Sequence, residues 1–457
     1  MENSSNTKNI TFWNKSFRGN NTIYTINPIE LKRYIESTNI CIFAINSQTK
    51  VIQFTNGIAK EITPQEVFNI CLKYIETFKN TALTNAFLRQ GETLILSKKA
   101  ILGSLNITDL LPVRDKIDKA FIFYENCFVE ISPHLEFIIN AYSKINNLNG
   151  FVWEKSILQR HFTQNSEVCV FERFLKLVTN NDEHFNCVVC AIGYLLHSYK
   201  NPSVTKVLII SDENTEVENK ANGGTGKGMI VKSVEKFKNV ATQNGKNIDL
   251  SNNRFAFQSI TLFTDLLFLD DVKKGFDFEE LFSIITDKTI VEQKNKASFE
   301  IPFEFSPKII ISSNYQIQGD SSSHNRRKYL IFLNNYFSDL YTPFMEFNHL
   351  FFSDWDKVEW NRFDTFMISC IRKFLENGLI DYEKNKELQL KKLKQEIDIN
   401  VFELLENRRN ELNRFYSLKE IKLKNTKQIS LYAQYKGFEF KTRQNNGCTE
   451  FLFKPKK

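Results

Sequence analysis

Apolar runs and helical patterns alternate along the chain and predict an α/β protein. Residues 40–45 form a short apolar run typical of a strand. Residues 63–79 repeat apolar positions three and four apart behind a Thr-Pro start, which predicts a capped helix. Residues 168–178 and 185–199 share this helical spacing and precede a strand-like run at 206–210. We therefore expect an α+β N-terminal region, then a helical stretch, then an α/β region.

Composition excludes several classes of protein. Hydrophobic residues make up 42% and charged residues 25% of the 457 positions, as in folded globular proteins. No window approaches the ~18–20 apolar residues of a membrane span, and the start lacks a basic region followed by an apolar core. The eight cysteines are scattered, which fits reduced thiols. We expect a cytoplasmic protein with no membrane partner.

Positive charge is concentrated at the C-terminal end. The chain has 60 Lys and Arg against 53 Asp and Glu, a net charge of +7. Residues 417–457 hold ten of the basic residues and three Glu, so this segment accounts for the whole net charge. A basic terminal module indicates a polyanionic partner, most often nucleic acid. A solvated basic tail has the same composition, and this alternative stays open.

The same end of the chain has a recognisable pattern of elements. A charged helical stretch at 381–412 is followed by a helix and two strands, which join at Asn445–Gly447 in a favourable hairpin turn. A helix followed by a β-hairpin with strong positive charge resembles a winged-helix DNA-binding domain. A basic protein-interaction tail is the main alternative.

The most informative segment is a glycine-rich run with the sequence NGGTGKG. Its glycines allow several backbone N–H groups to point toward one anion, and the helix predicted after it adds the positive end of its dipole. Lys227 would reach the β- and γ-phosphates of a nucleotide, so the run resembles a Walker A loop. The candidate nucleotide-binding residues are Asn222, Gly223, Gly224, Thr225, Gly226, Lys227 and Gly228.

The loop departs from the Walker A pattern at two positions. Ala221 stands where the first glycine would fall, and Gly228 stands where a Ser or Thr follows the lysine. That hydroxyl normally helps to hold Mg²⁺, so its loss puts metal binding in doubt. Thr225 or a water molecule can compensate, and both outcomes stay open.

Two acids follow an apolar run in residues 266–272, which have the sequence LLFLDDV. A buried parallel strand that ends in carboxylates is what a Walker B element requires. Asp270 would hold Mg²⁺, and Asp271 would orient or deprotonate the attacking water. The same pattern also occurs on solvated turns, so it gains weight only from its neighbours.

Two further motifs follow in order. Residues 307–314 form a β-rich run that ends in Asn314, whose amide can contact the γ-phosphate or the attacking water. Arg326 and Arg327 come just before another apolar run, where a guanidinium group can act as an arginine finger. Chance supplies each motif easily but rarely supplies all of them in this order.

This constellation resembles the superfamily 3 helicases, specifically the helicase part of phage and plasmid primase-helicase proteins. The resemblance covers about residues 150–385. Beyond the motifs above, it includes GYLLHSYK (193–200), ITDKTIVEQKNK (285–296), IPFEFSPKIIISSN (301–314) and PFMEFNHLFFSDWDKVEW (343–360).

The resemblance implies an AAA+-like P-loop ATPase core that assembles with itself into a ring, usually a hexamer. Such rings translocate on single-stranded DNA using ATP and Mg²⁺. By position, Lys227 resembles the phosphate-binding lysine and Asn314 the sensor, while Arg326 or Arg327 resembles a finger that acts on a neighbour's ATP. Asp270 and Asp271 resemble the acid pair.

The resemblance also implies a DNA-contacting loop and a division into regions. The stretch 287–300 corresponds to the loop, and Lys294 and Lys296 are its candidate phosphate contacts. The expected regions are 1–150, an α+β domain of unassigned role; 151–200, a helical region; 201–385, the ATPase core; and 386–457, a basic helical and winged-helix-like module.

We therefore expect an ATP-dependent helicase that serves the replication of a phage, plasmid or mobile element, with a separate primase as a further partner. Three alternatives stay open. The first is an ATP-binding, non-hydrolysing initiator or loading factor, which Gly228 favours. The second is a primase-helicase with its primase in residues 1–150, where Asp115 and Asp118 are the nearest metal-binding candidates. The third is an interaction protein with an inactive ATPase fold.

Overall fold

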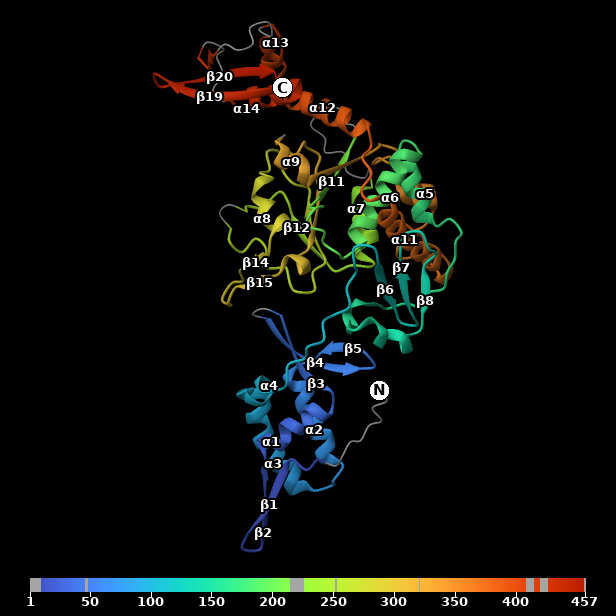
Figure 1. Cartoon of the computed structure of the whole chain (residues 1–457), viewed down its shortest axis with the longest axis vertical. Helices are drawn as coiled ribbons and strands as arrows, with labels where there is room; N and C mark the ends of the chain where they lie inside the picture. The colour runs from blue at the N-terminus through green and yellow to red at the C-terminus, as the bar shows by residue number, and fades with distance from the viewer. Residues whose placement is uncertain are drawn as a thin grey trace. The chain divides into compact units, whose positions relative to one another are not determined.

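The computed structural model describes residues 10–45, 48–213, 226–250, 253–319, 321–407, 415–419 and 426–455. The chain divides into two compact units, each of which is considered by itself (Figure 1). The N-terminal unit comprises Met1–Arg114, Phe121–Glu130 and Ile138–Phe162. The C-terminal unit comprises Asp115–Ala120, Ile131–Phe137 and Thr163–Lys457.

The first 162 residues combine helices with sheets that are mostly antiparallel, in which β5–β9 and β6–β10 pair parallel. One sheet has the strand order β3-β4-β5-β9 and another the order β10-β6-β7-β8, while β1 and β2 form a separate hairpin. The elements are β1 (Trp13–Arg18), β2 (Asn21–Ile26), α1 (Pro28–Ser37), β3 (Ile40–Ile45), β4 (Gln48–Thr55), β5 (Ile58–Glu61), α2 (Pro64–Glu76), α3 (Thr81–Gly91), a π-helix (Glu92–Ser97), α4 (Ala100–Gly103), β6 (Ala120–Tyr124), β7 (Phe128–Ile131), β8 (Ile138–Asn140), a 3-10 helix (Tyr142–Leu148), β9 (Val152–Trp153), another 3-10 helix (Glu154–Ser156) and β10 (Ile157–Leu158).

Helix α2 begins where the sequence predicts it. The Thr63 hydroxyl accepts a hydrogen bond from the Glu66 N–H at 3.2 Å, and the Glu66 carboxylate accepts one from the Thr63 N–H at 2.7 Å. This capping box satisfies two backbone donors that the first turn leaves free. The helix then buries its apolar face, including Val67 and Cys71, in the core of the unit.

The C-terminal unit contains a parallel sheet with helices around it. Its elements are α5 (Val170–Val178), α6 (Asp182–Leu196), β11 (Val207–Asp212), α7 (Lys227–Glu235), β12 (Val240–Asn244), β13 (Leu266–Asp270), a 3-10 helix (Glu279–Leu281), α8 (Phe282–Thr286), β14 (Thr289–Val291), β15 (Phe299–Ile301), another 3-10 helix (Phe303–Phe305), β16 (Lys308–Ser312), α9 (Ser322–Arg327), β17 (Lys328–Leu333), α10 (Pro343–Phe347), α11 (Lys357–Asn377), α12 (Lys384–Glu396), α13 (Ile399–Asn407), β18 (Tyr416–Ser417), α14 (Lys427–Lys436), β19 (Phe438–Asn445) and β20 (Cys448–Pro455).

The central sheet has the strand order β12-β13-β16-β11-β17, and all its pairings are parallel. The chain leaves β11 toward β12 on one side and returns to pair β17 on the other side of β11. Strand β11 therefore marks a topological switch point, and ligands of open α/β sheets bind outside the carboxyl ends of the strands at such a point. All residues of β11 and β16 are buried, as expected for strands covered on both faces. The mixed α/β architecture predicted from sequence is confirmed.

Helices α6 and α11 pack closely in the same unit. A Cβ atom at Gly193 would lie 2.1 Å from the carbonyl oxygen of Cys370, so glycine permits this approach. Helix α6 buries residues on all its faces, which explains its almost uniformly apolar sequence. The helical character predicted for 168–178 and 185–199 is confirmed by α5 and α6, although α6 ends at Leu196.

The C-terminal residues form a small core around α14 and a three-stranded sheet of order β18-β20-β19. The predicted hairpin is present, with Asn446 and Gly447 at positive φ in its turn. Helix α12, which the sequence groups with this basic region, also packs on the central sheet. Its Asn385 side chain donates a hydrogen bond of 2.8 Å to the Leu330 carbonyl of β17. Among the described residues, no helix is long and apolar enough to cross a membrane.

Candidate functional site

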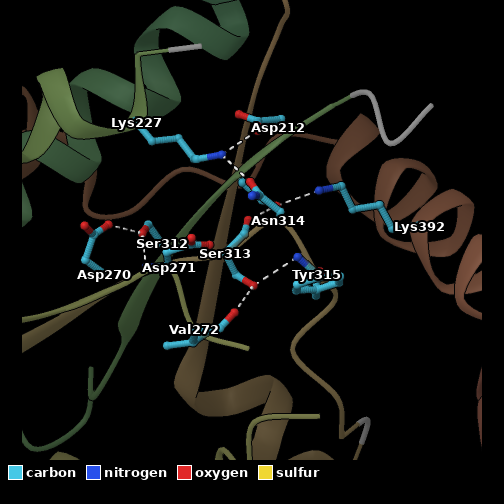
Figure 2. Close-up of polar contacts among 11 residues, drawn as sticks. Asp212, Lys227, Asp270, Asp271, Val272, Ser312, Ser313, Asn314, Tyr315 and Lys392 are labelled. Carbon is cyan, nitrogen blue, oxygen red and sulfur yellow. Dashed lines mark hydrogen bonds and ion pairs between the residues drawn. The ribbon is translucent and has the colours of Figure 1, made fainter. Parts of the chain in front are cut away.

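Polar side chains meet at the carboxyl edge of the central sheet, beside the switch point. Asp212 ends β11, Asp270 ends β13, and Asn314 comes two residues after β16. Because parallel strands end at the same edge, residues far apart in sequence lie together there (Figure 2). Of the predicted loop, Asn222, Gly223, Gly224 and Thr225 lie outside the described residues, and Gly226 is the first loop residue that the structure describes.

Lys227 is the first residue of α7, and its ammonium group lies between Asp212 and Asn314. Its Nζ donates a hydrogen bond of 2.6 Å to the Asn314 side-chain oxygen and forms an ion pair with the Asp212 carboxylate (Figure 2). Gly226 caps the helix at φ 105°, and a Cβ there would lie 2.5 Å from the Phe174 ring. A glycine is therefore required both by the backbone and by the space.

The two neighbouring acids are held in different ways. The Ser312 hydroxyl donates to Asp270 Oδ1 at 2.7 Å and accepts from the Asp271 N–H at 2.7 Å. Asp271 has a φ of 55°, a left-handed conformation that costs a non-glycine residue about 1 kcal/mol. Its carboxylate pairs with Lys246 Nζ at 2.7 Å, while Asp270 is exposed at the strand end. The structure thus orients Asp270 through Ser312 and ties Asp271 to a lysine.

Hydroxyl groups join the ends of the three central strands. The Ser211 hydroxyl of β11 donates to the Ser313 carbonyl at 2.6 Å, and the Ser313 hydroxyl donates to the Val272 carbonyl at 3.2 Å. The Tyr315 N–H in turn donates to the Ser313 hydroxyl at 3.0 Å. These bonds fix the backbone of the turn on both sides of Asn314.

Sequence reasoning missed Asp212 and Lys392. Lys392 lies on α12, and its Nζ donates a hydrogen bond of 2.6 Å to the Ser211 hydroxyl (Figure 2). Burial lowers the pKa of Lys392 to about 8; Asp212 acts in the opposite direction, and Lys227 lowers the pKa further. The end of a buried strand was a signal for Asp212. No local signal separates Lys392 from Lys391, because both lie in a charged helical run.

The two arginines lie at the amino ends of the parallel strands, at the edge of the sheet opposite to Lys227. They end α9, directly before β17, whose first residue Lys328 pairs with Val207 at the start of β11. The six residues of β11 then separate this edge from Asp212, roughly 17–20 Å along the strand. The structure therefore does not bring Arg326 and Arg327 to the Lys227 site of the same chain.

The two arginines also differ from each other. Arg326 is exposed, while Arg327 is buried. The guanidinium of Arg327 lies 4.2 Å from the centre of the Phe282 ring and donates to the Ser323 carbonyl at 3.0 Å. Arg326 is thus the one free to reach another molecule through its exposed position, and Arg327 supports α9.

Lys294 and Lys296 lie on the exposed connection between β14 and β15. The two strands pair antiparallel between Thr289–Val291 and Phe299–Ile301 and follow β13 in the chain. Both lysines are exposed. The stretch 287–300, expected to carry a DNA-contacting loop, thus forms a short antiparallel pair with the two lysines in its connection. Their contact with DNA stays a prediction.

The donor set at the carboxyl edge suits a hard cation that is shared with a phosphate. Among the residues the structure describes, no three His, Cys, Asp or Glu side chains gather as metal ligands. Mg²⁺ is commonly held by one or two carboxylates together with water and substrate phosphates. Asp270 beside Lys227 fits that kind of site and does not fit a metal centre built from protein ligands alone.

Comparisons with known proteins give one family and a few structures. A family of unknown function, DUF5906, matches residues 219–327, and no curated protein matches the chain. The apo C-terminal region of NrS-1 is 14% identical, with a TM-score of 0.41 over 93% of this chain and 99% of that chain. JCV helicase with a bound acetamide compound is 12% identical, with a TM-score of 0.25 over 52% and 65%. One of these neighbours is thus named a helicase. At such TM-scores the likeness says nothing about the activity of this chain.

Proposed function

We propose that this chain is an ATP-driven helicase that translocates on single-stranded DNA during replication of a phage, plasmid or mobile element. One observation carries the proposal: Lys227, at the start of a helix after the switch-point strand, contacts Asp212 and Asn314 beside the strand-end acid Asp270. This is the placement that binding and hydrolysis of a nucleoside triphosphate require. The sequence motifs that resemble superfamily 3 helicases supply the class of motor.

Each residue at this edge would have a separate role in nucleotide binding and hydrolysis. Lys227 and the N–H groups at the start of α7 would neutralise the phosphates, and the Asn314 amide would contact the terminal phosphate or the attacking water. Asp270, oriented by Ser312, would hold Mg²⁺. The ion would supply charge neutralisation at the β- and γ-phosphate oxygens. Asp271 would orient the water once its carboxylate is released from Lys246.

The placement of the arginines supports self-assembly. Arg326 and Arg327 lie at the sheet edge away from Lys227, so a guanidinium can act on ATP only if a neighbouring copy supplies it. Arg326 is exposed and is the better candidate. A ring, with the hexamer as the usual form of the resembled family, provides such a neighbour at every site.

Two basic surfaces are candidates for the DNA track. Lys294 and Lys296 on the β14–β15 connection would contact phosphates without sequence preference. The module of α13, α14 and the β19–β20 hairpin has the order of elements expected of a winged helix, and Lys441 and Arg443 are exposed on β19. The N-terminal unit would bind partner proteins, such as a separate primase.

One alternative has a specific observation in its favour. Gly228 is exposed and has open space where its Cβ would lie, so no steric demand explains the missing hydroxyl. A protein that binds ATP without hydrolysing it, such as an initiator or a loading factor, has no need of that group. The primase alternative gains nothing from Asp115, which is buried and accepts a hydrogen bond of 2.6 Å from the Ser198 N–H.

The test is ATP hydrolysis by the full chain with and without single-stranded DNA. We expect DNA to stimulate turnover, Lys227→Ala to abolish nucleotide binding, and Asp271→Asn to retain binding while it lowers kcat about 100-fold or more. ATP binding without turnover would replace the motor by the non-hydrolysing alternative. No ATP binding at all would leave an interaction protein with an inactive ATPase fold.

A further inference from the structure

A second lysine reaches the phosphate edge from outside the sheet. Lys392 lies on α12, about 180 residues after β11 in the chain, and it is 2% exposed. Its four-carbon stem runs from the helix to the end of β11, where the ammonium donates to the Ser211 hydroxyl (Figure 2). The residue after Ser211 is Asp212, the ion-pair partner of Lys227. Lys392 and Lys227 therefore approach the same carboxylate from different elements.

The hydrogen bonding of Lys392 differs from that of the buried lysines with a structural role. Lys328 donates to the carbonyls of Ile317, Gln318 and Gly319 at 2.7–2.8 Å. For Lys392, Ser211 supplies the single hydrogen-bond acceptor found among the described residues, although an ammonium has three protons to donate. A buried charge is costly without partners, so a site of this kind is suited to an anion that completes the set.

Positive and negative groups are balanced around Lys392. The charged groups that act on the Lys392 ammonium are Asp212, Lys227 and Glu396, two carboxylates and a second ammonium. The ammonium also lies 5.3 Å from the centre of the Phe332 ring. The Gln316 N–H also donates a hydrogen bond of 2.7 Å to Glu396 Oε1. Burial and Lys227 both disfavour the charged form of Lys392, and a phosphate placed between the two lysines reverses that balance.

We propose that Lys392 contacts the terminal phosphate of ATP and so makes the nucleotide site depend on α12, a helix outside the central sheet. The inference rests on the proposed function, because it names a further binding residue of that site. An ADP molecule lacks the group that Lys392 would contact. The residue therefore distinguishes ATP from ADP.

Helix α12 also connects the phosphate edge to the basic C-terminal residues. Beyond its bond to the Gln316 N–H, Glu396 accepts a hydrogen bond from the Gln428 side chain of α14 through its carbonyl, at 3.3 Å. The Gln428 side-chain oxygen accepts from the Asp398 N–H at 2.7 Å. A shift of Lys392 toward a phosphate moves the helix that holds the first turn of α14. ATP binding is thus coupled to the module proposed to bind DNA.

The experiment compares Lys392→Met with Lys391→Met in the full chain. Methionine keeps most of the apolar stem and removes the charge, and Lys391 is the exposed neighbour on the same helix. Dissociation constants are measured for ATP and for ADP with Mg²⁺ by titration calorimetry. We expect Lys392→Met to weaken ATP about 10- to 100-fold and ADP less than threefold, because a charge-assisted hydrogen bond is lost with ATP alone. Lys391→Met leaves both constants unchanged.

Each outcome separates this inference from the proposed function. Equal weakening of ATP and ADP, or no weakening, overturns the assignment of Lys392 while Lys227→Ala still abolishes binding. Failure of the unaltered chain to bind ATP overturns the proposed function instead. A second readout is the affinity for single-stranded DNA with a non-hydrolysable ATP analogue against ADP. The difference between the two nucleotides must shrink in Lys392→Met, which a merely structural lysine would not cause.

If Lys392→Met does not fold, the unaltered chain still provides the test. The ratio of ADP to ATP dissociation constants is then measured at pH 7 and pH 9.5. A ratio that stays constant overturns the inference, because Lys392 loses its proton over this range in the absence of a phosphate.

Discussion

Both edges of the central sheet hold lysines that are buried or, in the case of Lys227, half-buried, but the lysines at the two edges contact different kinds of acceptor. At the amino edge, Lys308 begins β16 and donates to the carbonyls of Tyr194 and His197 at the end of α6, and Lys328 begins β17 and donates to three carbonyls. At the carboxyl edge, Lys227 and Lys392 contact side chains, namely Asp212, Asn314 and Ser211.

The two kinds of acceptor differ in how easily they can release a lysine. The carbonyls bound by Lys308 end helix α6, and those bound by Lys328 belong to the connection between β16 and α9. Backbone carbonyls cannot move away without a change in the backbone itself, so both lysines act as permanent structural contacts. Carboxylate, amide and hydroxyl side chains can exchange a lysine for a ligand at little cost to the fold. The contacts at the carboxyl edge therefore suit the phosphate binding that we propose for it, whereas those at the amino edge suit a structural role.

The comparison of the two edges predicts that the largest effect is a loss of stability when a lysine of the amino edge is replaced. Lys328→Met leaves three carbonyls of residues 317–319 without their donor, and we expect a loss of about 3 kcal/mol in the free energy of unfolding. Lys294→Met, at an exposed position, is the control and should change stability by less than about 0.5 kcal/mol. Urea unfolding measures both. An equal small loss in the two variants contradicts the structural role of Lys328.

A smaller effect concerns pH at the carboxyl edge. Burial holds the pKa of Lys392 at about 8, with Lys227 acting in the same direction and Asp212 and Glu396 against it. The ammonium is charged below this pH, so the affinity for ATP should fall about tenfold between pH 7 and pH 9.5. Calorimetric titration at several pH values gives the profile. Lys392→Arg should flatten it, because a guanidinium keeps its charge.

The same pKa has a separate consequence for stability without nucleotide. The folded-state pKa of about 8 lies below the ordinary value of 10.5, so the unfolded chain binds more protons between these two pH values. The contribution of Lys392 to the free energy of unfolding therefore rises as pH increases through this window. Affinity for ATP and this stability term change in opposite directions with pH.

The smallest expected effect is at Gly228, the second residue of α7. Its Cβ position is open, so Gly228→Ser restores the hydroxyl of the Walker A pattern without a clash. We expect the Mg²⁺ concentration needed for half-maximal ATP hydrolysis to fall several-fold. Gly228→Ala is the matched control, because it fills the same open Cβ position without a hydroxyl. Alanine gains more helix propensity than serine, so helix propensity alone would favour the control. An equal response to alanine and serine contradicts the role of the hydroxyl.

The positions of the candidate site residues at the strand ends could be predicted from sequence, because they depend on the local pattern of apolar and polar residues. Apolar runs that end in polar residues place Asp270 and Asn314 at one edge, and the glycine before Lys227 marks the start of a helix. The roles assigned to these residues stay predictions. The structure adds that Lys227 and Asn314 lie within hydrogen-bond distance, which spacing alone does not show.

Other parts of the site depend on packing and had no local signal. Lys392 differs from Lys391 only in the face of α12 that it occupies, and that face is set by contact with the sheet. The partner of Asp271, Lys246, comes from the loop after β12 and is brought near by strand pairing. The distance of Arg326 from Lys227 likewise follows from the parallel order of the strands.

The position of Arg326 at the far edge has a consequence for inheritance. If a neighbouring copy supplies Arg326 to the proposed nucleotide site, each site belongs to a pair of chains, and a chain without this arginine would impair its neighbour and keep its own pocket intact. Inactive copies made alongside normal ones would enter the same assemblies and interrupt them. Loss of this arginine would then behave as a dominant trait, whereas loss of expression would be recessive.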